Sequence, residues 1–104
     1  MDLVDEIYTL SAAFPKNEQF GLTSQLRRAA VSVPSNIAEG CARGGTKELI
    51  YFLNVASGSL SEIDTQIEIA SRLGYTEDVE SVRNRIDSVF AMLVAHIAAL
   101  KRKI

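Results

Sequence analysis

Tryptophan is absent from this 104-residue sequence, and cysteine, histidine and proline are scarce, with one, one and two copies. Because Cys41 is the only cysteine, an internal disulfide and a cysteine-based zinc site are excluded. No run reaches the roughly 18 apolar residues that a membrane span requires. The first residues include Asp2, Asp5 and Glu6 and lack the basic segment of a signal peptide. We therefore expect a cytoplasmic protein with no membrane partner.

An excess of basic charge is also missing, since 13 acidic residues against 11 basic ones give a formal net charge of −2. Proteins that coat nucleic acid usually have a basic excess, so that class is not indicated. The basic residues do form two clusters, Arg27-Arg28 and Lys101-Arg102-Lys103. A weak patch becomes effective when an oligomer repeats it in every subunit. Our second hypothesis is therefore an adaptor that contacts RNA or DNA through Arg27, Lys101, Arg102 and Lys103.

No set of residues in the sequence names a reaction. The di-iron sites of helical bundles use Glu-x-x-His pairs, whereas Leu93 stands three residues before His96. Ser32-x-x-Ser35 lacks the lysine that a serine nucleophile would need, and no glycine-rich phosphate loop is present. Spacing alone does not exclude a dyad of His96 and Cys41, but we expect His96 at the edge of the core and Cys41 inside it. The sequence thus predicts a protein without catalytic activity, cofactor, metal or small-molecule substrate.

What the sequence does contain is a long stretch of small and polar residues, from Phe20 to Gly45. Apolar residues recur in it at steps of three and four, which places them on one side of a helix: Leu22, Leu26, Ala29, Ala30, Val33, Ile37 and Cys41. Pro34 removes one hydrogen bond within the helix and crowds a backbone carbonyl, so a bend is expected. In an alternative interpretation the helix breaks at Pro34, and Asn36 caps a new helix with Glu39 in a capping box. We favour one bent helix over residues 22–43, because the apolar steps stay in phase along the whole stretch.

A polar stripe follows another side of the same predicted helix. Residues three and four apart on a helix are neighbours, and this spacing relates Gln25, Arg28, Ser32, Ser35, Asn36, Glu39 and Arg43. Ser59 and Glu62 of the next helix are expected to join them. We predict that this polar stripe sets helix packing or subunit contacts. Candidate ion pairs between helices are Arg28 with Glu39, or Arg43 with Glu62.

Three further stretches have the apolar spacing of helices. The first covers residues 1–14 and ends before Pro15, which disfavours the helical conformation in the residue that precedes it. The next begins at Thr46 as a cap and ends at Leu73-Gly74, and the last begins at Thr76, also as a cap. Four helices with short links predict an all-α, antiparallel up-down-up-down four-helix bundle. We expect a single domain over residues 1–104, with a Pro-bent second helix and a shortened first helix.

Two stretches carry a family resemblance, FPKNEQFGLTSQLRRAAVSVPSNIAEGCARGG at residues 14–45 and FLNVASGSLSEIDTQIEIASRLGY at residues 52–75. The chain closely resembles the family of 23S ribosomal RNA intervening-sequence proteins, and the resemblance covers nearly its whole length. It implies an antiparallel four-helix bundle that forms a ring-shaped homopentamer and has no catalytic activity. A related branch serves diversity-generating retroelements, where a basic ring engages a reverse transcriptase and nucleic acid. This chain is slightly acidic and departs from that branch.

Members of this family usually carry further residues, including an aromatic one, before the position of Met1. We therefore expect Met1 to be an internal methionine or a mis-assigned start, and we predict an unfilled apolar groove beside the distal part of the other helices. Our first hypothesis for the function is a non-enzymatic, self-associating scaffold or adaptor, assembled as a homopentamer.

Overall fold

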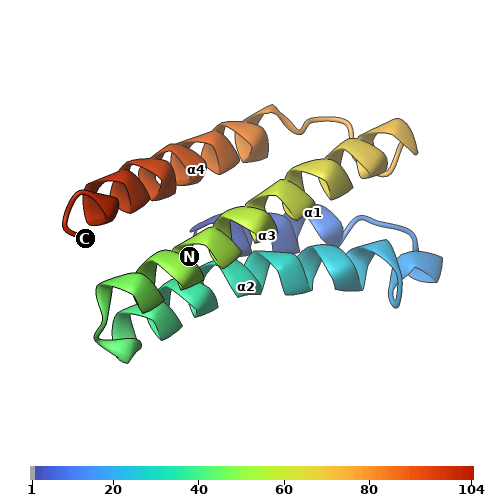
Figure 1. Cartoon of the computed structure of the whole chain (residues 1–104). Coiled ribbons are helices and arrows are strands. Elements are labelled where there is room, and N and C mark those ends of the chain that lie inside the picture. The colour runs from blue at the N-terminus through green and yellow to red at the C-terminus, as the bar shows by residue number, and fades with distance from the viewer. Residues whose placement is uncertain (1) are drawn as a thin grey trace.

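A computed structural model describes residues 2–104, and the regular elements of these residues are all helical. α1 (Asp2–Ser11) is followed by a short 3-10 helix, η1 (Lys16–Glu18), and by three long helices, α2 (Leu22–Arg43), α3 (Thr46–Arg72) and α4 (Glu80–Lys101) (Figure 1). No strand occurs among the described residues. The prediction of an all-α fold with four helices is confirmed.

The central helix α2 runs from Leu22 to Arg43 without interruption at Pro34. The alternative interpretation with a break at this position is therefore wrong. Asn36, which would have capped a new helix, instead donates from Nδ2 to the carbonyl and the Oγ of Ser32, each at 2.8 Å. Gly44 ends the helix with φ at 81°, a left-handed conformation that glycine adopts without a Cβ clash. The bend at Pro34 stays a prediction.

Two helix ends differ from the prediction. α1 ends at Ser11 rather than Phe14, and the Phe14 N–H donates to the Ser11 carbonyl at 3.0 Å in the turn that follows. α4 begins at Glu80 rather than directly after Thr76. The reason lies in Asp78, whose carboxylate accepts a hydrogen bond from the Glu80 N–H at 3.1 Å. A side chain nearer to the helix thus satisfies a terminal N–H group, which was the role expected of Thr76.

α2 and α3 pack closely and run in opposite directions. The hydroxyl oxygens of Ser32 and Ser59 lie 2.8 Å apart, and Gly40 lies beside Leu49 and Phe52. As the residue number rises along α2, it therefore falls along α3. A Cβ atom added to Gly40 would lie only 2.9 Å from the Cβ atom of Phe52. The absence of a side chain at Gly40 is what lets the two backbones approach this closely.

Arg85 connects α4 to α1. Its Nε donates to Glu6 at 2.6 Å and its Nη1 donates to Asp2 at 3.4 Å. One turn earlier in α4, the Ser81 hydroxyl also donates to Glu6, at 2.8 Å. Higher numbers in α4 thus face lower numbers in α1, so these two helices are antiparallel as well. Arg83 of the same helix donates to Glu68 of α3 at 3.0 Å.

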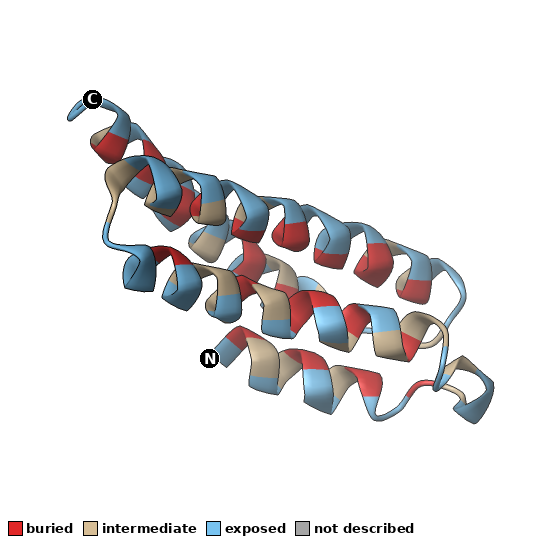
Figure 2. Ribbon diagram, turned by 60° about the horizontal axis from the view of Figure 1, so that its bottom comes forward, coloured by how far each residue is buried: buried red, intermediate tan, exposed pale blue. Residues whose placement is uncertain are grey.

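The core lies along the inward side of α3, where apolar residues at steps of three and four are fully buried from Leu53 to Ala70 (Figure 2). Each neighbouring helix adds a row of apolar side chains to it. The core residues with the lowest exposure are Ile7 of α1, Leu26 and Ala30 of α2, Leu53, Ala56, Leu60, Ile63, Ile67 and Ala70 of α3, and Val82 and Leu93 of α4.

α1 has 10 described residues, whereas α2 and α4 each have 22. It lies beside only part of the length of the longer helices (Figures 1 and 2). Near its first residues, a hollow of about 230 Å³ is lined by Val33, Pro34 and Ile37 of α2 and by Val89 and Met92 of α4. An apolar hollow thus occurs where the sequence predicted an unfilled groove. The expectation about Met1 lies outside the described residues.

The ion pairs between helices predict a loss of stability in acid. The hydrogen bond from Arg85 lowers the pKa of Glu6, and those from Arg83 and then Arg72 lower the pKa of Glu68. A carboxyl group with a lower pKa in the folded state contributes stability above its unfolded pKa, about 4.3 for glutamate. That contribution disappears as the pH falls through the folded-state pKa. We expect the urea midpoint to fall in this acid range, and to fall less in Glu6→Gln, which has no carboxyl group to protonate. An equal fall in both proteins would contradict this account.

Candidate functional site: an interaction surface

One part of the polar stripe lies between α2 and α3. The Ser32 and Ser59 hydroxyls share a hydrogen bond of 2.8 Å, and Ser59 is buried. Asn36 donates to the same Ser32 hydroxyl. Buried polar groups need hydrogen-bond partners. These three side chains provide such partners for one another, so they fit between closely packed helices. This part of the stripe links helices within one subunit.

The rest of the polar stripe is exposed and less connected. Gln25, Arg28, Ser35 and Glu62 are exposed, and the structure does not join them to one another. Glu39 and Arg43 form an ion pair within α2, with Arg43 Nη2 2.7 Å from Glu39 Oε1. The Arg43 guanidinium also lies over the Phe52 ring of α3, 5.2 Å from its centroid.

Both candidate ion pairs from the sequence are wrong. Arg43 bonds to Glu39, four residues earlier on the same helix, rather than to Glu62. Arg28 and Glu39 lie on one continuous helix and are separated by about 16 Å along its axis. The helix already places the Glu39 carboxylate one turn from Arg43, so this pair forms with little further loss of side-chain freedom.

The outer surface of α4 is a larger feature, which the sequence analysis missed. Phe90, Met92 and Val94 are 40%, 57% and 50% exposed. The signal was present in the sequence, because His96 is the single polar residue between Phe90 and Leu100. A helix that is hydrophobic on all sides is normally buried on all sides. In this chain, α4 therefore leaves apolar area uncovered.

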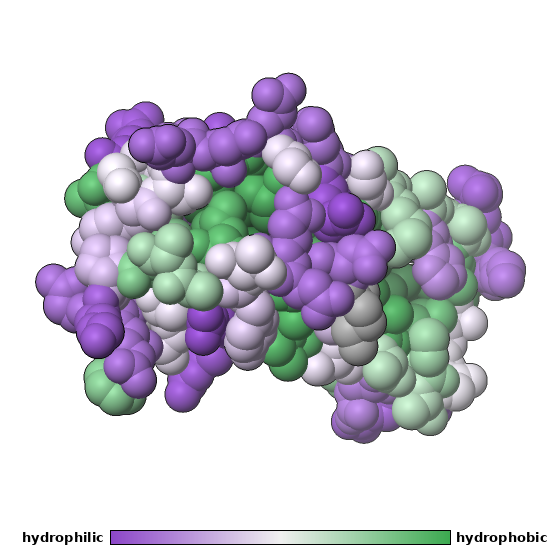
Figure 3. Space-filling model, turned by 180° about the vertical axis from the view of Figure 1, so that it is seen from behind, coloured by the Kyte–Doolittle hydropathy of each residue, from purple (hydrophilic) through white to green (hydrophobic). Residues whose placement is uncertain are grey.

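This apolar area continues toward α2. Seen from the side on which α1 lies, hydrophobic side chains gather at the end of the molecule where α2 and α4 extend beyond α1 (Figure 3). A hydrophilic band separates them from a second hydrophobic area. The 230 Å³ hollow between Ile37 of α2 and Met92 of α4 belongs to the same end. Together, the hollow and the exposed residue Met92 form the surface that we call the distal apolar surface. Phe90 and Val94 are exposed on another side of α4, because residues two apart on a helix point in nearly opposite directions.

The predictions for Cys41 and His96 are also wrong, because both residues are exposed. The apolar side of α2 continues past the first residues of α1, so the helix spacing that placed Cys41 in the core does not place it under a neighbour. Within residues 2–104, no group of three or more histidine, cysteine or acidic side chains is placed to hold a metal ion.

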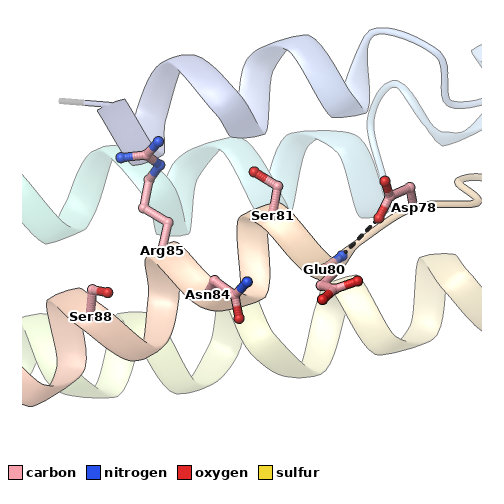
Figure 4. Close-up of a pocket in the computed structure, with 6 residues that line it drawn as sticks. All are labelled: Asp78, Glu80, Ser81, Asn84, Arg85 and Ser88. Atoms are coloured by element: carbon pink, nitrogen blue, oxygen red, sulfur yellow. Dashed lines mark hydrogen bonds between the residues drawn. The ribbon is translucent and has the colours of Figure 1, made fainter.

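A polar hollow of about 550 Å³ lies along the first turns of α4. Figure 4 shows its six lining residues, among them Ser81, Asn84 and Arg85, pointing in different directions rather than toward one point. The Arg85 guanidinium is already engaged by carboxylates of α1. A binding site requires polar groups that converge on a ligand, and these groups do not.

The structure does not bring the two basic clusters together within one subunit. The Nε of Arg27 donates to the Ser11 hydroxyl at 2.8 Å, and its guanidinium lies 4.6 Å from the centroid of the Tyr8 ring. Lys101, Arg102 and Lys103 are exposed at the chain end, and the beginning of α2 lies at the other end of the molecule (Figure 1).

These observations define a class of protein, a four-helix bundle whose notable site is an uncovered apolar surface rather than a pocket with convergent polar groups. A family model described as 23S rRNA-intervening sequence protein matches residues 1–95, and the chain belongs to this family. A comparison with curated proteins found no match. None of the described helices is long and apolar enough to cross a membrane.

Proposed function

We propose that this protein is a non-enzymatic scaffold or adaptor that associates with itself to form a ring-shaped homopentamer. The observation that supports the proposal best is the uncovered apolar area of α4, which consists of Met92 at the distal apolar surface and of Phe90 and Val94 on another side of the helix, each at least 40% exposed. Complete burial of a fully exposed side chain of this size contributes about 1.5–3 kcal/mol, so covering the exposed half contributes about half as much. Three such side chains in every subunit are a strong drive for association. The resemblance of residues 14–75 to a ring-forming family supports the count of five.

The exposed part of the polar stripe supplies a rim for the same assembly. Interfaces between proteins combine an apolar centre with polar residues at the edge. Arg28, Ser35 and Glu62 are exposed on α2 and α3, so they are available for hydrogen bonds to a second copy.

Replacement of Met92 by glutamate is expected to shift the protein from a mass near five times 11.4 kDa toward the mass of one subunit. The change places a charge in the proposed interface, where no partner is provided and desolvation is unfavourable. Light scattering coupled to size-exclusion chromatography measures the mass. Ser88→Glu is the matched control, because Ser88 is an exposed polar residue one turn earlier on the same helix. A monomeric wild-type protein, or an unchanged mass in Met92→Glu and in Phe90→Glu, would contradict the proposal.

A second function, an adaptor for RNA or DNA, is supported by the exposed run Lys101-Arg102-Lys103 at the end of α4. A ring would repeat these three cations in every subunit, which raises the affinity for a polyanion. Double charge reversal, Lys101→Glu with Arg102→Glu, should weaken binding of an oligonucleotide, and binding to the wild type should weaken as salt rises. Binding that does not respond to salt would argue against this function.

A further inference from the structure

The groove between α1 and the beginning of α2 combines exposed aromatic rings with arginines. It has a volume of about 580 Å³, and its lining includes Tyr8 of α1, Phe20, and Ser24, Arg27 and Arg28 of α2. On α2 these residues follow a spacing of three and four, so they form a line along one side of the helix. The groove thus presents rings and cations along the same line.

Phe20 gives this groove an unusual surface. Phe20 is 90% exposed and stands two residues before Leu22, the first residue of α2. The ring of Phe20 therefore offers almost its whole face to another molecule. Across the groove, the Tyr8 ring is 42% exposed and supports the Arg27 guanidinium.

The lining of the groove carries two arginines and no carboxylate. Four other hollows on the described part of the chain each include at least one acidic side chain. The nearby Glu18 carboxylate is engaged elsewhere, because it accepts from the Tyr75 hydroxyl at 2.8 Å and from the Leu22 N–H at 3.2 Å. In a chain with a net charge of −2, this groove is therefore a local positive region.

Two hydrogen bonds hold the Arg27 guanidinium in one orientation. It donates from Nε to the Ser11 hydroxyl at 2.8 Å and from Nη2 to the Tyr8 carbonyl at 3.3 Å. A guanidinium has five N–H donors, so these bonds orient the group and leave donors for an anion. Arg28, the next residue, is exposed.

We propose that this groove binds single-stranded nucleic acid, with a base stacked on Phe20 and the phosphates beside Arg27 and Arg28. Proteins that bind single strands combine a positively charged groove with aromatic side chains on which the bases stack. An acidic peptide would use the arginines but has no planar ring to cover Phe20. The inference rests on the second proposed function and names a site for it that is separate from the terminal basic run.

The test is the fluorescence anisotropy of a labelled single-stranded oligothymidylate mixed with the full chain. Phe20→Ala is expected to weaken binding about tenfold, because the loss of base stacking on one aromatic side chain lowers the affinity by about this factor or more. Phe20→Trp should retain binding, because it keeps an aromatic face. Tyr51→Ala is the control, as it removes a ring that is 62% exposed on α3.

Arg28→Gln should reduce the slope of log affinity against log salt by about 0.7, the value for one phosphate contact on a single strand.

The mass of each variant is measured in the same samples, because Arg28 also belongs to the polar stripe. Unchanged affinity in Phe20→Ala would overturn the inference, and so would equal competition by polyglutamate or by the duplex of the same length. Loss of binding in the Lys101→Glu, Arg102→Glu double variant with no effect of Phe20→Ala would reject this groove while leaving the adaptor function intact. A mass change that fully accounts for the weaker binding of Arg28→Gln would also count against the groove.

Discussion

Replacement of Ile63 by alanine is expected to lower the free energy of unfolding by about 2–5 kcal/mol. Ile63 is fully buried in the middle of α3, in the row of residues that packs the bundle core. The substitution removes apolar contacts and leaves a cavity, because closely packed neighbours relax only partly into the space. Urea denaturation followed by circular dichroism measures the change.

Ile69→Ala on the same helix is the matched control for this prediction. Ile69 is 43% exposed, so the same three carbon atoms are removed from a site that already contacts water. Both variants gain the same small amount of helix propensity, which cancels in the comparison. Ile69→Ala should change the free energy of unfolding by less than about 1 kcal/mol. Equal losses of unfolding free energy in the two variants would show that Ile63 is not more deeply buried than Ile69.

Alanine substitution at two glycines is expected to have opposite effects. Alanine in place of glycine inside a helix normally stabilises by about 0.5–1 kcal/mol. Gly58→Ala should show this gain, because nothing lies within 4 Å of the Cβ position on α3. At Gly40 of α2, the new atom would lie 2.9 Å from the Cβ atom of Phe52 and 3.0 Å from Cδ1 of Leu49.

Overpacking of this kind costs about 1–3 kcal/mol, which exceeds the gain in helix propensity. Gly40→Ala should therefore lower the urea midpoint, whereas Gly58→Ala should raise it. Both measurements are made at one protein concentration, since association also affects the apparent stability. A stabilised Gly40→Ala protein would mean that α2 and α3 are farther apart than the structure places them.

The contacts of α4 with the other helices relate the stability of the fold to the proposed assembly. Besides its buried apolar residues Val82, Ile86, Leu93, Ile97 and Leu100, α4 is joined to its neighbours by ion pairs such as Arg85 with Glu6. Surface ion pairs contribute about 0–1 kcal/mol each. In the proposed assembly, coverage of Phe90 and Met92 by other copies would stabilise α4, so folding and association would be coupled.

Much of the helical architecture could be predicted from local patterns. The spacing of apolar residues and the glycines after Arg43 predicted α2 with its exact bounds, Leu22–Arg43. The apolar spacing of α3 likewise corresponds to its buried residues from Leu53 to Ala70. These features depend on the 3.6-residue period of a helix and on local conformational preferences, which a sequence displays directly.

The candidate site depended more on the tertiary structure. Ser32, Asn36 and Ser59 of the polar stripe are joined by hydrogen bonds. No pattern in the sequence could rank Glu39 above Glu62 as the partner of Arg43. That choice depends on which carboxylate the fold brings within reach of a long and flexible side chain. The groove of Phe20 and Arg28 likewise required coordinates, because Tyr8 and Arg27 come from different helices.

By itself, the sequence determined that this protein forms helices and which residues of each helix are apolar. Only the tertiary structure decided which apolar residues are covered. Cys41 has the spacing of a core residue, yet it is exposed, because α1 is shorter than α2 and α4 and covers only part of their length. Periodicity reports the side of a helix on which a residue lies, whereas burial requires a second helix that reaches it.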